Sequence, residues 1–222
     1  MTTTISVKAF INTVKAWKEL TSTSPSGQHL DQYHAAILEP DLAWVNTDLL
    51  NIPITYGFAP GEWWTHSVTP LIEKGPPGLP YLTRLCVIHL LEANYNLFLK
   101  LIFDRRMINN AELAEALNDQ QHGSRPRRMT TDPLFLARLK NDLTRQTRAN
   151  SAQIDNDATG CNDRIVPSLL GMIARRRLGM PTNAIVYHAD ALQNMRYAVK
   201  QAAGIYMTEY TVTIIAPLYG TG

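Results

Sequence analysis

Apolar residues near the start of the chain recur at helical spacing, which places their side chains on one face. The residues concerned are Ile5, Phe10, Ile11, Val14 and Trp17. They predict a helix over residues 5–20. Similar spacing predicts helices over Asp31–Glu39, which stops before a proline, and over Glu92–Arg106. A shorter helix is expected at Ala111–Leu117.

A loop over residues 119–130, DQQHGSRPRRMT, precedes the next predicted helix. Thr130 or Thr131 is a suitable residue to cap that helix, and Pro133 falls in its first turn. Its apolar side is formed by Leu134, Leu136, Leu139 and Leu143. We therefore expect an amphipathic helix after the loop.

The last two predicted helices are marked by residues that begin or end helices. Pro167 lies at the start of a helix over Val166–Leu178, and Gly179 ends it. Pro181 then opens a helix that we expect to run to about Ala203. Its apolar residues are again spaced to form one face.

Four segments have the composition of strands. They are Thr65–Ile72, the apolar run LCVIHLL, Ala152–Thr159 and Ile205–Pro217. Because these strands are separated by helices and do not follow a regular βαβ alternation, the sequence predicts an α+β fold.

Composition narrows the class of protein. With 222 residues, 45% hydrophobic and 18% charged, the chain can bury a substantial core. It has no run of apolar residues long enough to span a membrane, and its start lacks the pattern of a secretory signal. Two cysteines are too few for a disulfide scaffold. We expect an intracellular protein, nuclear or cytoplasmic, that is not secreted.

The net charge is only +2, but basic residues gather in one segment. Between Gln120 and Arg148 they outnumber Asp132 and Asp142 by five. These basic residues are Arg125, Arg127, Arg128, Arg138, Lys140, Arg145 and Arg148. Such a run is commonly the solvated face of a helix, and it is also suited to contact the phosphates of a nucleic acid.

An acidic segment, IDNDATGCNDRI, carries the clearest candidate chemistry. On a strand, Asp155 and Asp157 point to the same side, and Asp163 follows beyond a turn. Carboxylates at the end of a strand can hold Mg²⁺, and two such ions can assist an in-line phosphoryl displacement. Alternatively, Asp163 caps the following helix.

Several stretches follow one another in order from about Leu20 to Gly222: SPSGQHLDQY, Lys74, Arg84 with RLCVIHLL, NLFLKLIFDRRM, QQHGSRPRRMTTDPLFLARLKNDL, IDNDATGCNDRI and LYGTG. Together they resemble the fingers and first palm portion of reverse transcriptases from retrotransposons, especially the non-LTR type. The resemblance implies a right-hand polymerase fold, with an N-terminal extension and helix-rich fingers over residues 1–150 and a partial palm over residues 151–222.

The resemblance also implies roles for individual residues. Asp157 would be the catalytic carboxylate that binds Mg²⁺, or Mn²⁺ in its place. The nucleotide would be contacted by Lys74, Arg84, Gln121, Gly123, Arg125 and Asn162. Arg127 and Arg128 would contact nucleic acid. The partners implied are an RNA template, a DNA primer, a dNTP and the remainder of the polymerase chain, with no membrane.

Two features depart from the family pattern. Asn162 stands where the family has an aromatic residue beneath the sugar. The sequence also has no Tyr-x-Asp-Asp block, which supplies the family's later catalytic aspartates. We therefore expect an N-terminal fragment of an RNA-directed DNA polymerase that is inactive or nearly so by itself. The alternative is a non-catalytic, nucleic-acid-binding remnant of a retroelement.

Overall fold

The computed structural model describes most of the chain. The described residues are 4–17, 26–59, 61–63, 66–73, 85–87, 90–123, 125, 127–129, 131–150, 152, 167–201 and 204–208. The helices are α1 (Val7–Ala16), α2 (Leu30–Ala36), α3 (Pro40–Tyr56), the 3₁₀ turn η1 (Gly61–Trp63), α4 (Ala93–Leu99), the π-helix η3 (Lys100–Met107), α5 (Ile108–Leu113), α6 (Thr131–Thr147), α7 (Pro167–Leu178) and α8 (Thr182–Asn194). The strands are β1 (His66–Glu73), β2 (Leu85–Val87), β3 (Arg196–Gln201) and β4 (Gly204–Thr208).

Local signals account for the ends of several helices. The hydroxyl of Ser6 accepts a hydrogen bond from the Ala9 amide at 3.2 Å and so caps α1. Helix α3 begins at Pro40 and ends at Gly57, whose φ of 75° is left-handed. Gly179, with φ of 61°, follows α7 in the same way. The predicted end of this helix at Gly179 is confirmed, whereas the helix ends at Ser6 and Gly57 and the start of α3 at Pro40 were not predicted.

Three consecutive helical segments form one continuous element from Ala93 to Leu113. The helix predicted over Glu92–Arg106 is confirmed, but the predicted gap before Ala111 is wrong. No glycine or proline lies between Met107 and Ala111, so nothing in that stretch breaks the backbone hydrogen bonds. The middle segment, η3, is a π-helix, which is wider than an α-helix.

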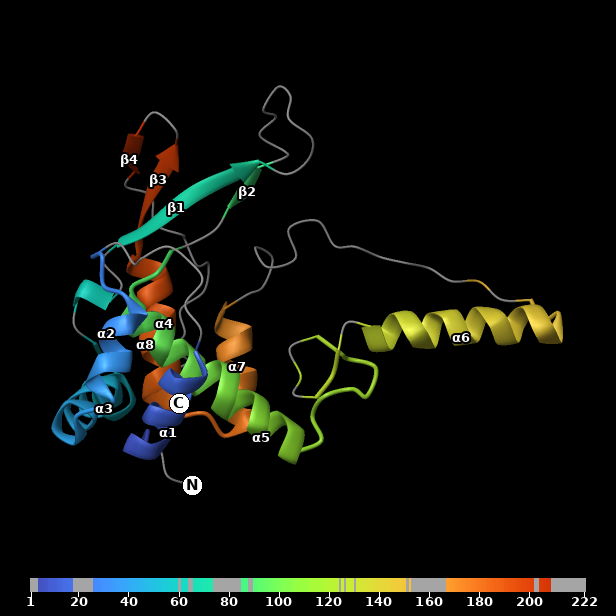
Figure 1. Cartoon of the computed structure of the whole chain (residues 1–222), viewed down its shortest axis with the longest axis horizontal. Helices are drawn as coiled ribbons and strands as arrows, with labels where there is room; N and C mark the ends of the chain where they lie inside the picture. Colours follow the sequence, from blue (N-terminus) through green and yellow to red (C-terminus); the bar gives the residue numbers. More distant parts are fainter. Residues whose placement is uncertain are drawn as a thin grey trace.

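Aromatic side chains form the centre of the core and join elements that are distant in sequence. Tyr187 of α8 lies edge-on to Phe98 and Tyr95 of α4, with ring centroids 5.5 and 5.9 Å apart. Trp63 packs on Phe98 at 6.3 Å. The hydroxyl of Tyr95 lies 2.7 Å from Nδ1 of His188. These contacts pack α8 against α4, and Figure 1 shows the two helices at the centre of the helical body.

The strands form one four-stranded sheet in the order β2-β1-β3-β4. The central pair, β1 and β3, is parallel, with His66 opposite Arg196. The two outer strands, β2 and β4, pair antiparallel with their neighbours. Figure 1 shows this sheet beyond one end of the helical body. The sheet joins strands from both sides of residue 150, and the domain boundary predicted there stays a prediction.

The predicted extension of the last helix to about Ala203 is wrong. Helix α8 ends at Asn194, whose side chain donates to the carbonyl and the carboxylate of Asp190 at 3.0 and 2.8 Å. Met195 is extended, with ψ of 129°, and β3 follows. Backbone pairing with β1 on one side and β4 on the other outweighs the helical spacing of the apolar residues.

Helix α6 lies apart from the other helices in Figure 1. Its predicted helical state is confirmed, but none of its residues is buried against the described part of the chain. The exposed apolar side chains are Leu134, Phe135, Leu136, Leu139 and Leu143. The apolar face predicted from the sequence is therefore present and uncovered among the described residues.

The described residues are predominantly helical, with one small sheet beside the helices. The helix-rich character of the predicted α+β fold is confirmed, whereas an even mixture of helix and strand is not observed. The predicted strand at Ala152–Thr159 lies outside the described residues except for Ala152.

Candidate nucleic-acid interface

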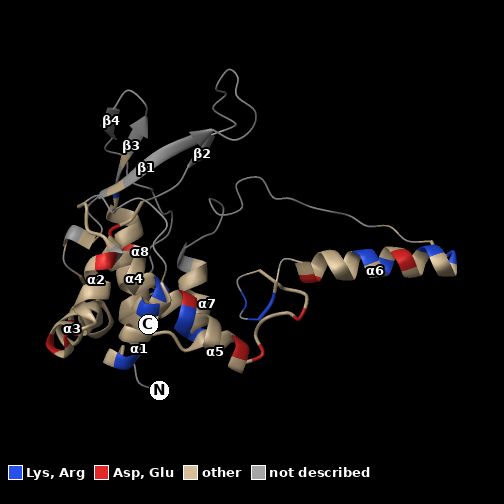
Figure 2. Cartoon of the chain, viewed as in Figure 1, with Lys and Arg blue, Asp and Glu red and all other residues tan. Residues whose placement is uncertain are grey.

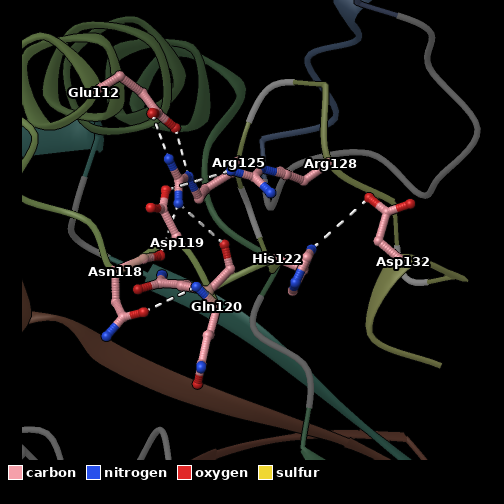
Figure 3. Close-up of polar contacts among 9 residues, drawn as sticks. Glu112, Asn118, Asp119, Gln120, His122, Arg125, Arg128 and Asp132 are labelled. Carbon is pink, nitrogen blue, oxygen red and sulfur yellow. Dashed lines mark hydrogen bonds and ion pairs between the residues drawn. The ribbon is translucent and has the colours of Figure 1, made fainter. Parts of the chain in front are cut away.

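An arginine organises the loop between α5 and α6. The Nε and Nη2 atoms of Arg125 donate to the two carboxylate oxygens of Glu112, each at 2.7 Å (Figure 3). The remaining terminal nitrogen donates to the Asn118 carbonyl at 2.8 Å. The side chain of Arg125 is only 8% exposed. A planar guanidinium suits this paired contact, so the loop is held to the end of α5 at one point.

Asn118 and its neighbours continue this arrangement (Figure 3). The side-chain oxygen of Asn118 accepts from the Gln120 amide at 2.9 Å, and its carbonyl accepts from the Gln121 amide at 2.9 Å. Arg128 lies 3.6 Å from Asp119, whose side chain is 96% exposed. Such an exposed ion pair contributes little stability, so Arg128 remains available to an external phosphate.

The other end of the loop is fastened at the start of α6. A carboxylate oxygen of Asp132 accepts from the Met129 amide at 2.8 Å and lies 3.8 Å from Nδ1 of His122 (Figure 3). The His122 side chain is largely buried. Asp132 is therefore occupied within the loop, in the first turn of α6, where a negative charge is favourable.

The Arg125–Glu112 contact also alters proton binding. The hydrogen bond from Arg125, and secondarily its charge, hold the pKa of the Glu112 carboxyl below its usual range. The same hydrogen bond raises the pKa of Arg125. Both groups therefore stay ionised at neutral pH, and Arg125 contributes no unneutralised charge to the basic segment.

The other basic residues of the segment are exposed. Arg127 has a left-handed backbone, with φ of 63°, and Arg128 follows it. Beyond them lie Arg138, Lys140, Arg145 and Arg148. Figure 2 shows basic and acidic residues alternating along α6, with basic residues at its end. The loop and helix present a surface that carries more positive than negative charge.

Five of the predicted site residues fall in this loop and are described. They are Gln121, Gly123, Arg125, Arg127 and Arg128. A Cβ atom added at Gly123 would meet no atom within 4 Å, so the free loop does not itself require a glycine there. The predicted residues Asp157, Asn162, Lys74 and Arg84 lie outside the described residues. Their predicted roles stay predictions.

A buried carboxylate that the sequence did not reveal joins the segment SPSGQHLDQY to the start of α4. Glu92, 7% exposed, accepts from the amide and the hydroxyl of Ser26 at 2.9 and 2.7 Å. Asn94 donates to the side chain of Gln28 at 3.3 Å and accepts from the Tyr33 hydroxyl. Residues 26–33 are thus bound to the start of α4. Because the contacts span more than sixty residues, no local pattern indicates them.

Among the described residues, no group of three or more His, Cys, Asp or Glu side chains is placed to hold a metal ion. No helix in that part of the chain has both the length and the apolar character needed to cross a bilayer. The predicted magnesium ligand, Asp157, is not among these residues.

Comparisons with known proteins add no assignment. The chain matches no known protein family, and a search of curated proteins finds no relative.

Proposed function

We propose that this chain belongs to an RNA-directed DNA polymerase of the retrotransposon class, and that residues 118–148 face nucleic acid. One observation carries the proposal: the loop that contains Gln121 and Gly123 is held internally by Arg125, which leaves Arg127 and Arg128 exposed. Phosphate contacts position a protein on a duplex, and exposed arginines supply them.

The charge balance of the segment supports this use. Arg125 is neutralised by Glu112, and Asp132 is occupied by the backbone of Met129. Six basic residues are exposed between residues 127 and 148, against two acids, the exposed Asp142 and Asp132, whose side chain is 42% exposed. If a template or primer strand lies along this segment, the basic side chains displace the counterions from the phosphates of that strand.

The chemistry proposed is nucleotidyl transfer. The primer 3′-oxygen forms a bond to the α-phosphorus of a dNTP, and the bond to the β-phosphate breaks to release pyrophosphate. Asp157 would hold the Mg²⁺ that assists this displacement, and Lys74 and Arg84 would bind the triphosphate. This part of the proposal rests on the sequence resemblance.

A second candidate is binding without catalysis. It is favoured by the sequence itself, which contains no Tyr-x-Asp-Asp block. Primer extension on an RNA template separates the two candidates. If the chain alone extends a primer and Asp157→Asn abolishes the extension, it is a polymerase in its own right. If it binds the duplex but does not extend the primer, only the binding part of the proposal stands.

Binding is tested by fluorescence anisotropy with a labelled RNA–DNA duplex at several salt concentrations. The double variant Arg127→Gln/Arg128→Gln should weaken binding and reduce the slope of log K against log salt by roughly one to two. A matched variant, Lys8→Gln/Lys15→Gln, removes two exposed charges from α1 and should leave the slope unchanged. Equal effects of the two variants would contradict the proposed interface.

A further inference from the structure

Helix α3 is packed on one side and exposes apolar side chains on the other. Its inner side enters the core through Ala43, Leu50 and Ile54. Its outer side carries a shallow hollow of about 390 Å³, lined mostly by apolar residues. We call these apolar residues the α3 face: Trp44, Val45, Leu49, Ile52 and Tyr56.

The composition of the α3 face is typical of a surface that contacts another protein. Trp44 is 57% exposed and Tyr56 is 68% exposed. Tyr56 also lies against the exposed Phe58, with ring centroids 6.0 Å apart. Single exposed apolar side chains are normal, but aromatic residues contribute much of the binding energy at interfaces. Several of them along one side of a helix therefore indicate a partner.

Carboxylates lie among these apolar side chains. Asp48 lines the hollow, and Asp41, seven residues earlier, lies two helical turns away on the same side of α3. Residues 30–56 contain no lysine or arginine, so α3 carries acidic residues alone (Figure 2). A partner with apolar and basic side chains would match this surface.

Helix α6 has the complementary features. Four apolar residues recur in it at three- and four-residue spacing and so share one side. None of them is buried against the described part of the chain. Lys140 lies beside this side, because it follows Leu136 by four residues and precedes Leu143 by three. We call the four residues the α6 face: Phe135, Leu136, Leu139 and Leu143.

The charge of α6 is opposite in sign to that of α3. Basic residues outnumber acidic residues over 131–148, whereas residues 30–56 carry only acidic ones. Complementary charge of this kind steers association and favours one partner over others. The basic residues are Arg138, Lys140, Arg145 and Arg148, against Asp132 and Asp142.

We propose that α6 of one copy of this chain docks on the α3 face of a second copy, while α6 of the second copy docks on the first. The two helices lie at opposite ends of the long axis in Figure 1, so a second copy is the natural source of the docked helix. A reciprocal pair is closed by a two-fold axis and forms a dimer with neither face left open. Its two contacts together bury twice the area of one, which favours a stable dimer.

The dimer leaves the candidate nucleic-acid interface accessible. Arg127 and Arg128 precede α6, and Arg145 points away from the α6 face, since it follows Leu143 by two residues. The proposal does not depend on nucleic-acid binding by residues 118–148, so either can fail alone.

The first test is size-exclusion chromatography with light scattering on the whole chain, at roughly 1 to 100 μM, a range that detects micromolar association. We expect the measured mass to rise with concentration toward twice 24.9 kDa. A chain that stays monomeric throughout would overturn the proposal, and so would masses that continue to rise beyond the dimer.

Two double variants identify the faces that pair. Trp44→Gln/Leu49→Gln alters the α3 face, and Leu139→Gln/Leu143→Gln alters the α6 face. All four positions are exposed and glutamine favours helix, so circular dichroism should show an unchanged helix content. Each variant alone should dimerise at least about tenfold more weakly than the unaltered chain.

An equimolar mixture of the two variants should associate more tightly than either variant alone. In the mixture, the intact α6 face of the first variant can dock on the intact α3 face of the second. If α6 instead pairs with α6, the variant altered at Trp44 and Leu49 will still dimerise, and if α3 pairs with α3, the other variant will. Either result would refute the proposal, as would a mixture that associates no better than its components.

Two further variants separate this contact from general stickiness. Leu169→Gln/Leu170→Gln removes two exposed apolar residues of α7 and should leave dimerisation unchanged. A loss equal to that at the α6 face would show unspecific apolar association and contradict the proposal. Asp41→Asn/Asp48→Asn keeps side-chain size and should weaken the dimer several-fold at low salt. Unchanged affinity in this variant would contradict the match of charge between α3 and α6.

Discussion

Two hydrogen bonds of 2.7 Å join the guanidinium of Arg125 to the carboxylate of Glu112, thirteen residues earlier in the chain. The residues between them include the start of the candidate nucleic-acid interface, residues 118–148. The contact closes the loop from its inner side and leaves its two following arginines exposed. It is the only arginine–carboxylate pair among the described residues in which both oxygens of the acid are used. The position of the exposed arginines therefore depends on a residue that does not itself face solvent.

Glu112→Gln should loosen this loop while keeping every basic residue in it. The glutamine amide has only one oxygen, so it cannot accept both hydrogen bonds from Arg125, and the loop will open more often. We expect trypsin to cleave after Arg127 or Arg128 several-fold faster than in the unaltered chain. Mass spectrometry of the early fragments measures this rate. Glu115→Gln, at an exposed acid nearby, is the control, and equal rates in both variants would disprove the anchoring role.

Gly123→Ala tests whether the loop requires a glycine for its own stability or only for the approach of a nucleic-acid strand. The added methyl group meets nothing within 4 Å, so the midpoint of thermal unfolding should change by less than about 2 °C. If a nucleic-acid backbone approaches the loop closely, the affinity for an RNA–DNA duplex should still fall. A large drop in the midpoint would mean that the loop packs differently, and an unchanged affinity would place the strand elsewhere.

Local signals in the sequence were sufficient for most helices. Pro40, Gly179 and Pro181 mark boundaries that depend only on backbone chemistry, so they can be read without tertiary information. The end of α8 could not be read in this way. Its apolar spacing continues past Asn194, and only pairing with β1 and β4 makes the following residues a strand.

The candidate interface was predictable in part for the same reason. Its basic residues are neighbours in sequence, so their common location follows from the chain itself. The partner of Arg125 is not part of the resembling segment, and nothing in the sequence distinguishes Glu112 from other acids. The binding of Ser26 by Glu92 is less predictable still, because it depends on how α4 packs beside a loop 66 residues earlier.

Gly171 of α7 lies against Ile185 of α8. A Cβ atom at this position would lie 2.8 Å from Cγ2 of Ile185, a methyl group that cannot move without rotating a buried, β-branched side chain. Alanine favours helix by about 1 kcal/mol over glycine, whereas overpacking costs roughly 1–3 kcal/mol. Gly171→Ala should therefore lower stability by roughly 1 kcal/mol in urea denaturation.

A double-mutant cycle tests the cause. In an Ile185→Ala background the obstructing methyl group is absent, so Gly171→Ala should become neutral or stabilising by up to about 1 kcal/mol. An equal loss in both backgrounds would show that the clash with Ile185 is not responsible.

Burial makes His188 a source of pH-dependent stability. Its Nδ1 lies 2.7 Å from the Tyr95 hydroxyl, and its ring centroid lies 4.7 Å from that of Phe103. Removal from water disfavours the imidazolium and lowers the pKa of His188 from 6.5 to about 4. The unfolded chain therefore binds a proton below pH 6.5 that the folded chain does not bind until about pH 4.

The stability that the chain gains from a neutral, buried His188 is fully present above pH 6.5 and is lost as the pH falls toward 4. At about 1.4 kcal/mol for each pH unit, the loss reaches roughly 3 kcal/mol. Urea denaturation between pH 7.5 and 4.5, roughly the window set by that linkage, measures it. His188→Asn keeps a polar atom near Tyr95 but does not titrate there, so its profile should be flatter. Since carboxylates titrate equally in both proteins, parallel profiles would mean that His188 is already solvated in the folded chain.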